Sequence, residues 1–183
     1  KLPHLLPQET VKNLKAAAWA DLKNEVEPVV HSPDGQPVRL SQLMDRDNAI
    51  FRQVATSTTV LDPLESILGP NIEIVKNRHN HATLNLASKN TDRFHRDITQ
   101  WSQPLTTVIF YLEETHLDNG WIQLIPGSHL LPGINYLHKI DLEPWVVESG
   151  IVHQAVPMPA GGLLLIDSLV FHRIGTNHTP NTR

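Results

Sequence analysis

The sequence predicts an α+β fold with a mainly β core, because a helical pattern in the first third gives way to a strand pattern in the rest. In residues 1–70 apolar residues recur every three to four positions, the spacing of an amphipathic helix. From residue 71 onward, alternating and short apolar runs are separated by glycine and proline turns, as in closely spaced strands. We therefore expect one domain over residues 1–183, with 1–70 as a mainly helical scaffold and 71–183 as a β core that closes into a barrel or sandwich.

Three segments of the first third have helical patterns. Glu9–Val26 is amphipathic, and Leu40–Val54 repeats the same pattern more loosely. Asp62 offers an N-cap before a proline at the first helical position, and Gly69 with the proline after it ends the segment. This punctuation predicts a short helix over Pro63–Leu68.

The remaining two thirds read as strands joined by turns. The Asp-Asn-Gly sequence at 118–120 and the Pro-Gly-Ser-His sequence at 126–129 are turn signals, and Leu130–Gly150 reads as a loop or lid. The expected strands lie within Ile72–Leu86, Pro104–Leu112, Trp121–Ile125, Val152–Met158, Gly162–Ile166 and Leu169–Phe171.

Composition narrows the possible functions. The chain has no cysteine, which excludes thiol catalysis, disulfides and zinc–thiolate sites. Its net charge of -4 gives no basic footprint for nucleic acid or for an anionic membrane surface. No apolar run approaches the roughly 20 residues of a membrane span, and the residues after Lys1 do not show the basic-then-apolar pattern of a secretion signal. We therefore expect a cytoplasmic protein that acts on a small molecule, and the oligomeric state stays open.

A His-x-Asp triplet, His95-Arg96-Asp97, is the main candidate for chemistry. Residues two apart on an extended chain point to the same side, so both side chains can reach one metal ion. With 11 histidines in the chain, one such pair is weak evidence by itself, but His172 after an apolar run offers a second imidazole. Two histidines and one carboxylate form the set that iron(II) binds while leaving adjacent positions open. Arg183, eleven residues after His172, can bind a carboxylate through two parallel hydrogen bonds.

The order of these motifs resembles the phytanoyl-CoA dioxygenase family over residues 71–183. The resemblance is carried by the triplet at 95–97, the Asp-Asn-Gly-Trp-Ile-Gln-Leu-Ile-Pro-Gly-Ser-His sequence at 118–129, the Pro-Ala-Gly-Gly-Leu-Leu-Leu sequence at 159–165 and the stretch from His172 to Arg183. It implies a double-stranded β-helix, also called a jelly roll or cupin-like barrel, with the N-terminal helices packed outside. It also implies iron(II), 2-oxoglutarate and O2 as cofactor and cosubstrates.

The resemblance assigns roles residue by residue. His95, Asp97 and His172 match the iron ligands, and Arg183 matches the partner of the far carboxylate of 2-oxoglutarate. Thr107 and Asn77 match positions that touch the cosubstrate. Family members frequently carry a serine two residues beyond the distal histidine, where this chain has Ile174, and the family's final strand after the arginine is absent here, so we expect the sequence to be trimmed.

The implied activity is C–H oxidation, by hydroxylation or oxidative cyclisation, with release of succinate and CO2. The carboxylate at Asp97 argues against a halogenase, which has a small residue there. We expect a polar natural-product or sugar-containing substrate, because the chain is acidic and His79 and His81 fall together on one face of the expected strand at the pocket mouth. Candidate stacking residues are Trp101, Tyr136 and Trp145.

Three alternatives stay open from the sequence. The protein could be a cupin-type metal enzyme that does not use 2-oxoglutarate, or a non-catalytic binding module on the same fold. His178 competes with His172 as the distal ligand, although its turn-like flanks favour His172. His129 reads as a structural residue.

Overall fold

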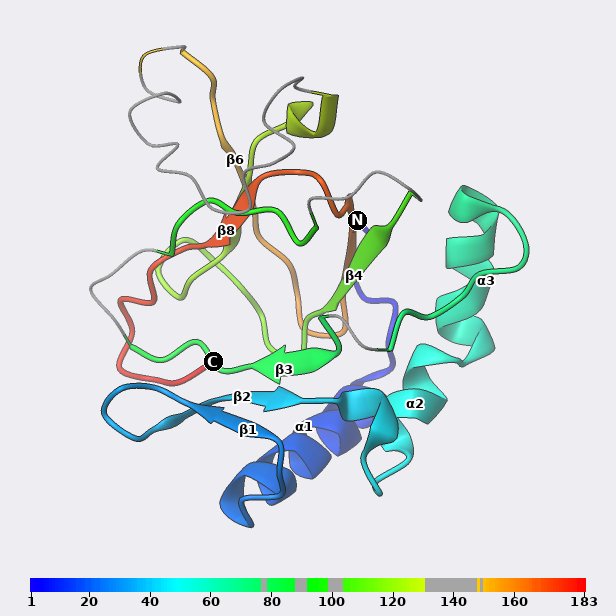
Figure 1. Cartoon of the computed structure of the whole chain (residues 1–183), viewed down its shortest axis with the longest axis vertical. Helices are drawn as coiled ribbons and strands as arrows, with labels where there is room; N and C mark the ends of the chain where they lie inside the picture. Colours follow the sequence, from blue (N-terminus) through cyan, green and yellow to red (C-terminus); the bar gives the residue numbers. More distant parts are fainter. Residues whose placement is uncertain (77–78, 88–91, 99–103, 131–147, 149) are drawn as a thin grey trace.

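The structure is a computed structural model that describes residues 1–76, 79–87, 92–98, 104–130, 148 and 150–183 (Figure 1). The helices are α1 (Gln8–Lys23), α2 (Ile50–Ala55) and α3 (Thr58–Leu68), with short 3-10 turns η1 (Leu43–Asp45) and η2 (Ser128–Leu130). The strands are β1 (Val29–His31), β2 (Pro37–Ser41), β3 (His81–Thr83), β4 (Thr106–Phe110), β5 (Ile122–Leu124), β6 (Gln154–Val156), β7 (Leu163–Asp167) and β8 (His172–Ile174).

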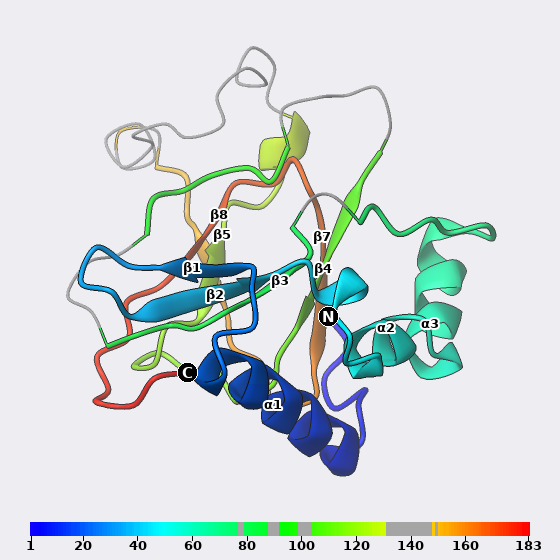
Figure 2. The same cartoon turned by 60° about the horizontal axis from the view of Figure 1, so that its bottom comes forward.

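All strand pairs among these residues are antiparallel and form three sheets. One sheet has the order β1-β2-β3, a second pairs β4 with β7, and the third has the order β6-β5-β8. The three helices lie outside the strands, with α1 beneath the β1-β2-β3 sheet (Figure 2). The predicted α+β class with a mainly β core is therefore confirmed, whereas closure of the sheets into a barrel stays a prediction.

The β4–β7 ribbon separates two apolar cores. Because side chains alternate along a strand, Val108 and Phe110 face the core that α1 covers, while Ile109 and Tyr111 face the β6-β5-β8 sheet. The register pairs Thr107 with Ile166 and so fixes which residues share the second face. This two-sided burial explains why the sequence of β4 is apolar on both faces, as predicted.

Helix α1 confirms the first predicted helix. Val11, Leu14, Ala18 and Leu22 are buried along one stripe and pack in the same core as Leu40 of β2, which is fully buried. The three-to-four spacing of the apolar residues therefore does locate the buried face of this helix.

The prediction of a helix from Leu40 to Val54 is wrong over its first half. Leu40 and Ser41 end strand β2, which pairs with β1 and β3, and only η1 and α2 in this stretch are helical. The β1–β2 hairpin was not predicted, so the first third is not simply a helical scaffold. Pairing with β3, a segment some 40 residues later, overrides the loose local pattern.

Helix α3 begins at Thr58, five residues before the predicted start at Pro63, which lies inside the helix. Val60 is almost fully buried, and its packing extends the helix beyond the N-terminal signal read from the sequence. The predicted end is confirmed, since Gly69 follows the helix with a φ of 87° that favours glycine.

Among the later strands, β3 to β7 fall within the predicted stretches, apart from one residue of β7, but Leu169–Phe171 is not a strand. The Val170 amide donates to the Asp167 carbonyl, and the Leu169 amide donates to the Asp167 carboxylate. These two bonds close a turn directly after β7. His172 consequently begins β8 rather than ending a strand. Most of the predicted lid at 130–150, and with it Tyr136 and Trp145, lies outside the described residues, as does Trp101.

None of the helices in the described part of the chain is long and apolar enough to cross a membrane.

Candidate metal centre

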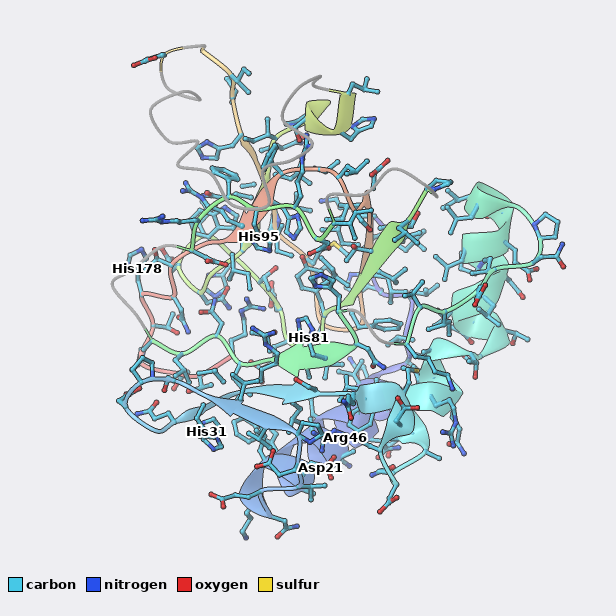
Figure 3. The ribbon with its side chains drawn as sticks, viewed as in Figure 1. Asp21, His31, Arg46, His81, His95 and His178 are labelled. Atoms are coloured by element: carbon cyan, nitrogen blue, oxygen red, sulfur yellow. The ribbon has the colours of Figure 1, made fainter. Side chains whose placement is uncertain are left out.

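His95, Asp97 and His172 come together at one end of the space between the sheets, and Figure 3 labels His95 there. Their nearest ligand atoms all lie within 4.8 Å of one another, and no other metal-type group of three appears among the described residues. The backbones of His95 and His172 exchange hydrogen bonds of 2.9 and 3.0 Å across an antiparallel bridge. The Asp97 amide bonds to the Ser168 carbonyl at 3.1 Å. The backbone therefore fixes where each of the three side chains starts.

The tautomers of both histidines follow from their neighbours. Nδ1 of His95 lies 3.1 Å from the Arg93 carbonyl, and Nδ1 of His172 lies 3.0 Å from the Val170 carbonyl. Because a carbonyl oxygen only accepts, each Nδ1 carries the proton and each Nε2 presents a lone pair. Burial, and secondarily His172, lower the pKa of His95, which favours the neutral imidazole that a metal binds.

Asp97 is held so that one oxygen faces the histidines. Its Oδ2 accepts a 2.5 Å hydrogen bond from the Thr107 hydroxyl, which also lies 2.8 Å from the Ser168 hydroxyl. Its Oδ1 lies 3.6 Å from Nε2 of His172 and 4.0 Å from Nε2 of His95. Three lone-pair donors thus surround one point, and a cation at that point would relieve the cost of burying the carboxylate.

His79 is a further neighbour of Asp97. Its Nε2 donates to the Asp97 carbonyl at 2.9 Å, and its Nδ1 lies 3.5 Å from Asp97 Oδ1. His79 precedes β3 and has a φ of 49°, so the prediction that it shares a strand face with His81 is wrong. A positive φ in a non-glycine residue breaks strand alternation, yet the two rings still adjoin at 5.8 Å. Burial, with smaller contributions from Arg39 and His79, lowers the pKa of His81 to about 4.

Arg96, the middle residue of the triplet, has a structural role that the sequence did not indicate. It is fully buried, lies 4.2 Å from the centre of the Phe171 ring and donates to the Ser128 carbonyl at 2.7 Å. The Ser128 hydroxyl in turn accepts from the Phe171 amide at 2.8 Å. The predicted turn at 126–129 is therefore tied to the segment that carries His172.

Arg183 lies against the turn that precedes β5. Its guanidinium donates to the carbonyls of Asn119 and Gly120 at 3.0 and 2.7 Å. Burial lowers its pKa, while Tyr111 and Glu113 act in the opposite direction.

Buried polar atoms gather around this arginine. The Tyr111 hydroxyl, Trp121 Nε1 and Asn85 Nδ2 are buried without a hydrogen-bond partner in the described part of the chain. Burial raises the pKa of Tyr111, so its hydroxyl stays protonated and able to donate. Orphaned donors of this kind are uncommon in folded proteins and mark a place where an acceptor is expected to bind.

Other predicted residues lie elsewhere. His178 is exposed and is not part of the cluster, and its amide bonds to the Asp118 carbonyl at 2.8 Å. Ile174 pairs with Ile122 on β5, and Asn77 lies outside the described residues. Ser168 and Tyr111 were not predicted from the sequence. Only the strand pattern of β4 could have indicated Tyr111, which is four residues after Thr107 and on the same face.

A polar hollow of about 430 Å³ opens beside this centre, and the described side chains that line it are all polar or charged. Its lining includes Arg39, Ser41, Asp45, Lys76, His79 and His81.

Two histidines and an aspartate around one point form the ligand set of non-haem iron oxygenases. Comparison with known families places the chain more narrowly: the family described as phytanoyl-CoA dioxygenase (PhyH) matches residues 1–183, and the chain belongs to this family. The match includes the helical first third, which the sequence resemblance did not cover. The predicted enzyme class, a non-haem iron(II)- and 2-oxoglutarate-dependent oxygenase, is confirmed, and with it the cofactor and cosubstrates that the class uses.

Solved structures share the fold. The epimerase SnoN, in complex with Fe3+, alpha ketoglutarate and nogalamycin RO, is 21% identical over 100% of this chain and 74% of that chain, with a TM-score of 0.74. The carbocyclase SnoK from nogalamycin biosynthesis is 16% identical over 100% and 74%, with a TM-score of 0.77. EctD from S. alaskensis, with 2-oxoglutarate and 5-hydroxyectoine, is 17% identical over 96% and 65%, with a TM-score of 0.73. No curated protein matches the sequence.

Proposed function

We propose that this chain oxidises a C–H bond of a small polar molecule and that His95, Asp97 and His172 bind the iron(II) it needs. The observation that carries the proposal is the convergence of these three donors, each oriented by a second contact, at one buried point. When bound, iron(II) with 2-oxoglutarate and O2 supplies the oxidising power, and the chain contributes ligands, orientation and exclusion of water.

The interior fits a dicarboxylate cosubstrate between the metal centre and Arg183. His172 pairs with Leu124 at one end of β5, and the Gly120 carbonyl that Arg183 binds lies two residues before the other end of this strand. Arg183 uses two of its N–H groups for the carbonyls of Asn119 and Gly120, and the others can bind a carboxylate. The orphaned Tyr111 hydroxyl offers a neutral donor to the same carboxylate.

Two further cosubstrate contacts belong to the proposal. The Thr107 hydroxyl already donates its proton to Asp97, so toward 2-oxoglutarate it offers only a lone pair. Its stronger contribution is to hold the Asp97 carboxylate. For Asn77, contact with 2-oxoglutarate is supported only by the sequence resemblance.

The reaction we propose is hydroxylation or oxidative cyclisation of a polar natural-product or sugar-containing intermediate, with release of succinate and CO2. SnoN and SnoK are named as an epimerase and a carbocyclase from nogalamycin biosynthesis, so this fold supports more than one outcome. The polar lining of the hollow beside the metal centre supports a polar substrate.

Anaerobic addition of iron(II) and then 2-oxoglutarate tests the metal and cosubstrate sites together. We expect a weak visible charge-transfer band that needs both additions and is absent from Asp97→Ala. A folded wild-type protein without this band would contradict the proposal and favour a cupin-type enzyme or a binding module. Substrate-dependent succinate release from candidate glycosides and acyl thioesters then tests the substrate class, and turnover of acyl thioesters alone would contradict a polar, sugar-like substrate.

A further inference from the structure

The polar hollow is formed by one face of the β1-β2-β3 sheet together with Lys76, His79 and Asn80. In the antiparallel register Ser41 pairs with His81, so their side chains project to the same face, and Arg39 joins them because it is two residues before Ser41. The opposite face carries Leu40 and Ala82 against the core under α1. The sheet thus separates an apolar core from a polar hollow.

The hollow reaches the metal centre through His79. This residue lines the hollow, and its Nδ1 lies 3.5 Å from the Asp97 oxygen that faces the two histidines. Figure 3 shows His81 on the side of β3 that faces His95. A molecule in the hollow would therefore be adjacent to the proposed iron, with the two imidazoles beside it.

The charges in the hollow are unbalanced. Arg39 and Lys76 carry two positive charges against one negative charge on Asp45, and the Lys76–Asp45 ion pair is long, at 3.9 Å, and largely exposed. Arg39 makes no hydrogen bond or ion pair with any residue that the structure describes. One guanidinium, whose planar fork suits a carboxylate or phosphate, is left without a counter-charge.

A solvated outer sheet face would explain the polar residues but not their setting. His81 is partly buried, and burial is the main reason why its pKa falls to about 4, with Arg39 next, whereas the Arg39 side chain itself is exposed. The neutral His81 ring offers one donor and one acceptor, as hydroxyl groups require.

We propose that the polar hollow binds the molecule to be oxidised, and that it selects a hydroxylated substrate carrying one oxyanion, which Arg39 binds. This inference rests on the proposed function, because it needs the metal at His95, Asp97 and His172 to define the reacting end. It narrows the substrate class from polar to polar and anionic. A carboxylate and a phosphate share the chemistry that Arg39 recognises.

The test uses protein loaded with iron(II) and 2-oxoglutarate under anaerobic conditions, so that binding is measured without turnover. The probes are hydroxylated carboxylic acids, each paired with its neutral methyl ester, and a set of sugar phosphates, with affinity measured by calorimetry. We expect at least one acid or phosphate series to bind about 10-fold or more tightly than its neutral partners. A preference for carboxylates over phosphates, or the reverse, identifies the oxyanion.

Arg39→Ala should abolish the preference for anions, and Arg39→Lys should retain part of it. Lys12→Ala, which removes an exposed cation of α1 outside the hollow, is the matched control and should bind as the wild type does. Failure of both the acids and the sugar phosphates to bind more tightly than neutral probes, or undiminished anion binding by Arg39→Ala, would each overturn the proposal.

The charge-transfer band separates this inference from the proposed function. Arg39→Ala should keep the band, because Arg39 touches none of the three donors. If the wild type gives the band but anion binding does not depend on Arg39, the proposed function is retained and the proposed role of the hollow is wrong. If the folded wild-type protein gives no band, the proposed function itself is contradicted.

Discussion

The metal centre and the polar hollow meet at His79, but their side chains differ in how firmly hydrogen bonds fix them. His95 and His172 each bond to a backbone carbonyl, and the Asp97 carboxylate bonds to a hydroxyl. In the hollow, Arg39 has no such contact among the described residues. Metal chemistry needs donors fixed to within a fraction of an ångström, whereas binding of a charged group tolerates a mobile cation until the ligand arrives. Substitutions should therefore act on metal loading at one site and on affinity at the other.

The largest effect is expected from Asp97→Ala. Loss of an outer partner of a metal ligand costs about 10- to 100-fold in metal affinity or activity, and loss of the ligand itself should cost more than about 100-fold. Iron content after dialysis and the rate of succinate release measure the effect. Asp118→Ala, which removes a carboxylate outside the cluster, is the control and should load iron normally. Full iron occupancy in Asp97→Ala would place the metal elsewhere.

Arg183→Ala tests the cosubstrate end. Hydrogen bonds to a charged group contribute about 1.5–3 kcal/mol, so the KM for 2-oxoglutarate should rise about 10- to 100-fold, with a smaller change in kcat. Initial rates across a range of 2-oxoglutarate concentrations measure both constants.

Because Arg183 also binds the carbonyls of Asn119 and Gly120, its removal can weaken the fold as well. Arg183→Lys keeps the charge without the planar fork and should lie between wild type and Arg183→Ala. An unchanged KM in a variant that melts as wild type would favour an enzyme that does not use 2-oxoglutarate.

Thr107→Val should produce a smaller loss at the metal centre. It removes the hydroxyl that orients Asp97 but keeps the shape of the side chain, so iron affinity should fall about 10-fold. Thr107→Ser restores the hydroxyl and should recover most of that affinity. Titration of the anaerobic protein with iron(II) measures both. If Thr107→Val binds iron as wild type does but needs more 2-oxoglutarate, the cosubstrate contact is the main role of Thr107.

The last effect concerns His81 and acts on stability at acid pH, not on metal or cosubstrate binding. Its pKa is about 4 in the folded protein against 6.5 unfolded, so between these pH values the unfolded chain binds a proton that the folded protein does not. Stability is therefore lost as pH falls from about 6.5 towards 4, by at most about 3 kcal/mol. His81→Asn cannot titrate and should lose less stability in metal-free protein. Urea unfolding at the two ends of this range measures the difference, and equal losses in both proteins would contradict it.

The residues of the candidate site were easier to predict from the sequence than the helices and strands that surround them. His95, Asp97 and His172 were identified because the residue types and the two-residue spacing are local properties, and the structure brings them together as expected. The β1–β2 hairpin and the start of α3 were missed, because pairing with β3 and burial of Val60 depend on segments distant in the chain.

By itself, the sequence predicted the donor set and, through its resemblance, the family. A side chain's capacity to bind a metal does not depend on the fold. Only the tertiary structure decided that Thr107 holds Asp97, that Arg96 ties the 126–129 turn to His172's segment, and that Arg39 shares a hollow with His79. These contacts join separate parts of the chain. Strand register decides which side chains meet, because a shift of one residue would move each side chain to the opposite face of the sheet.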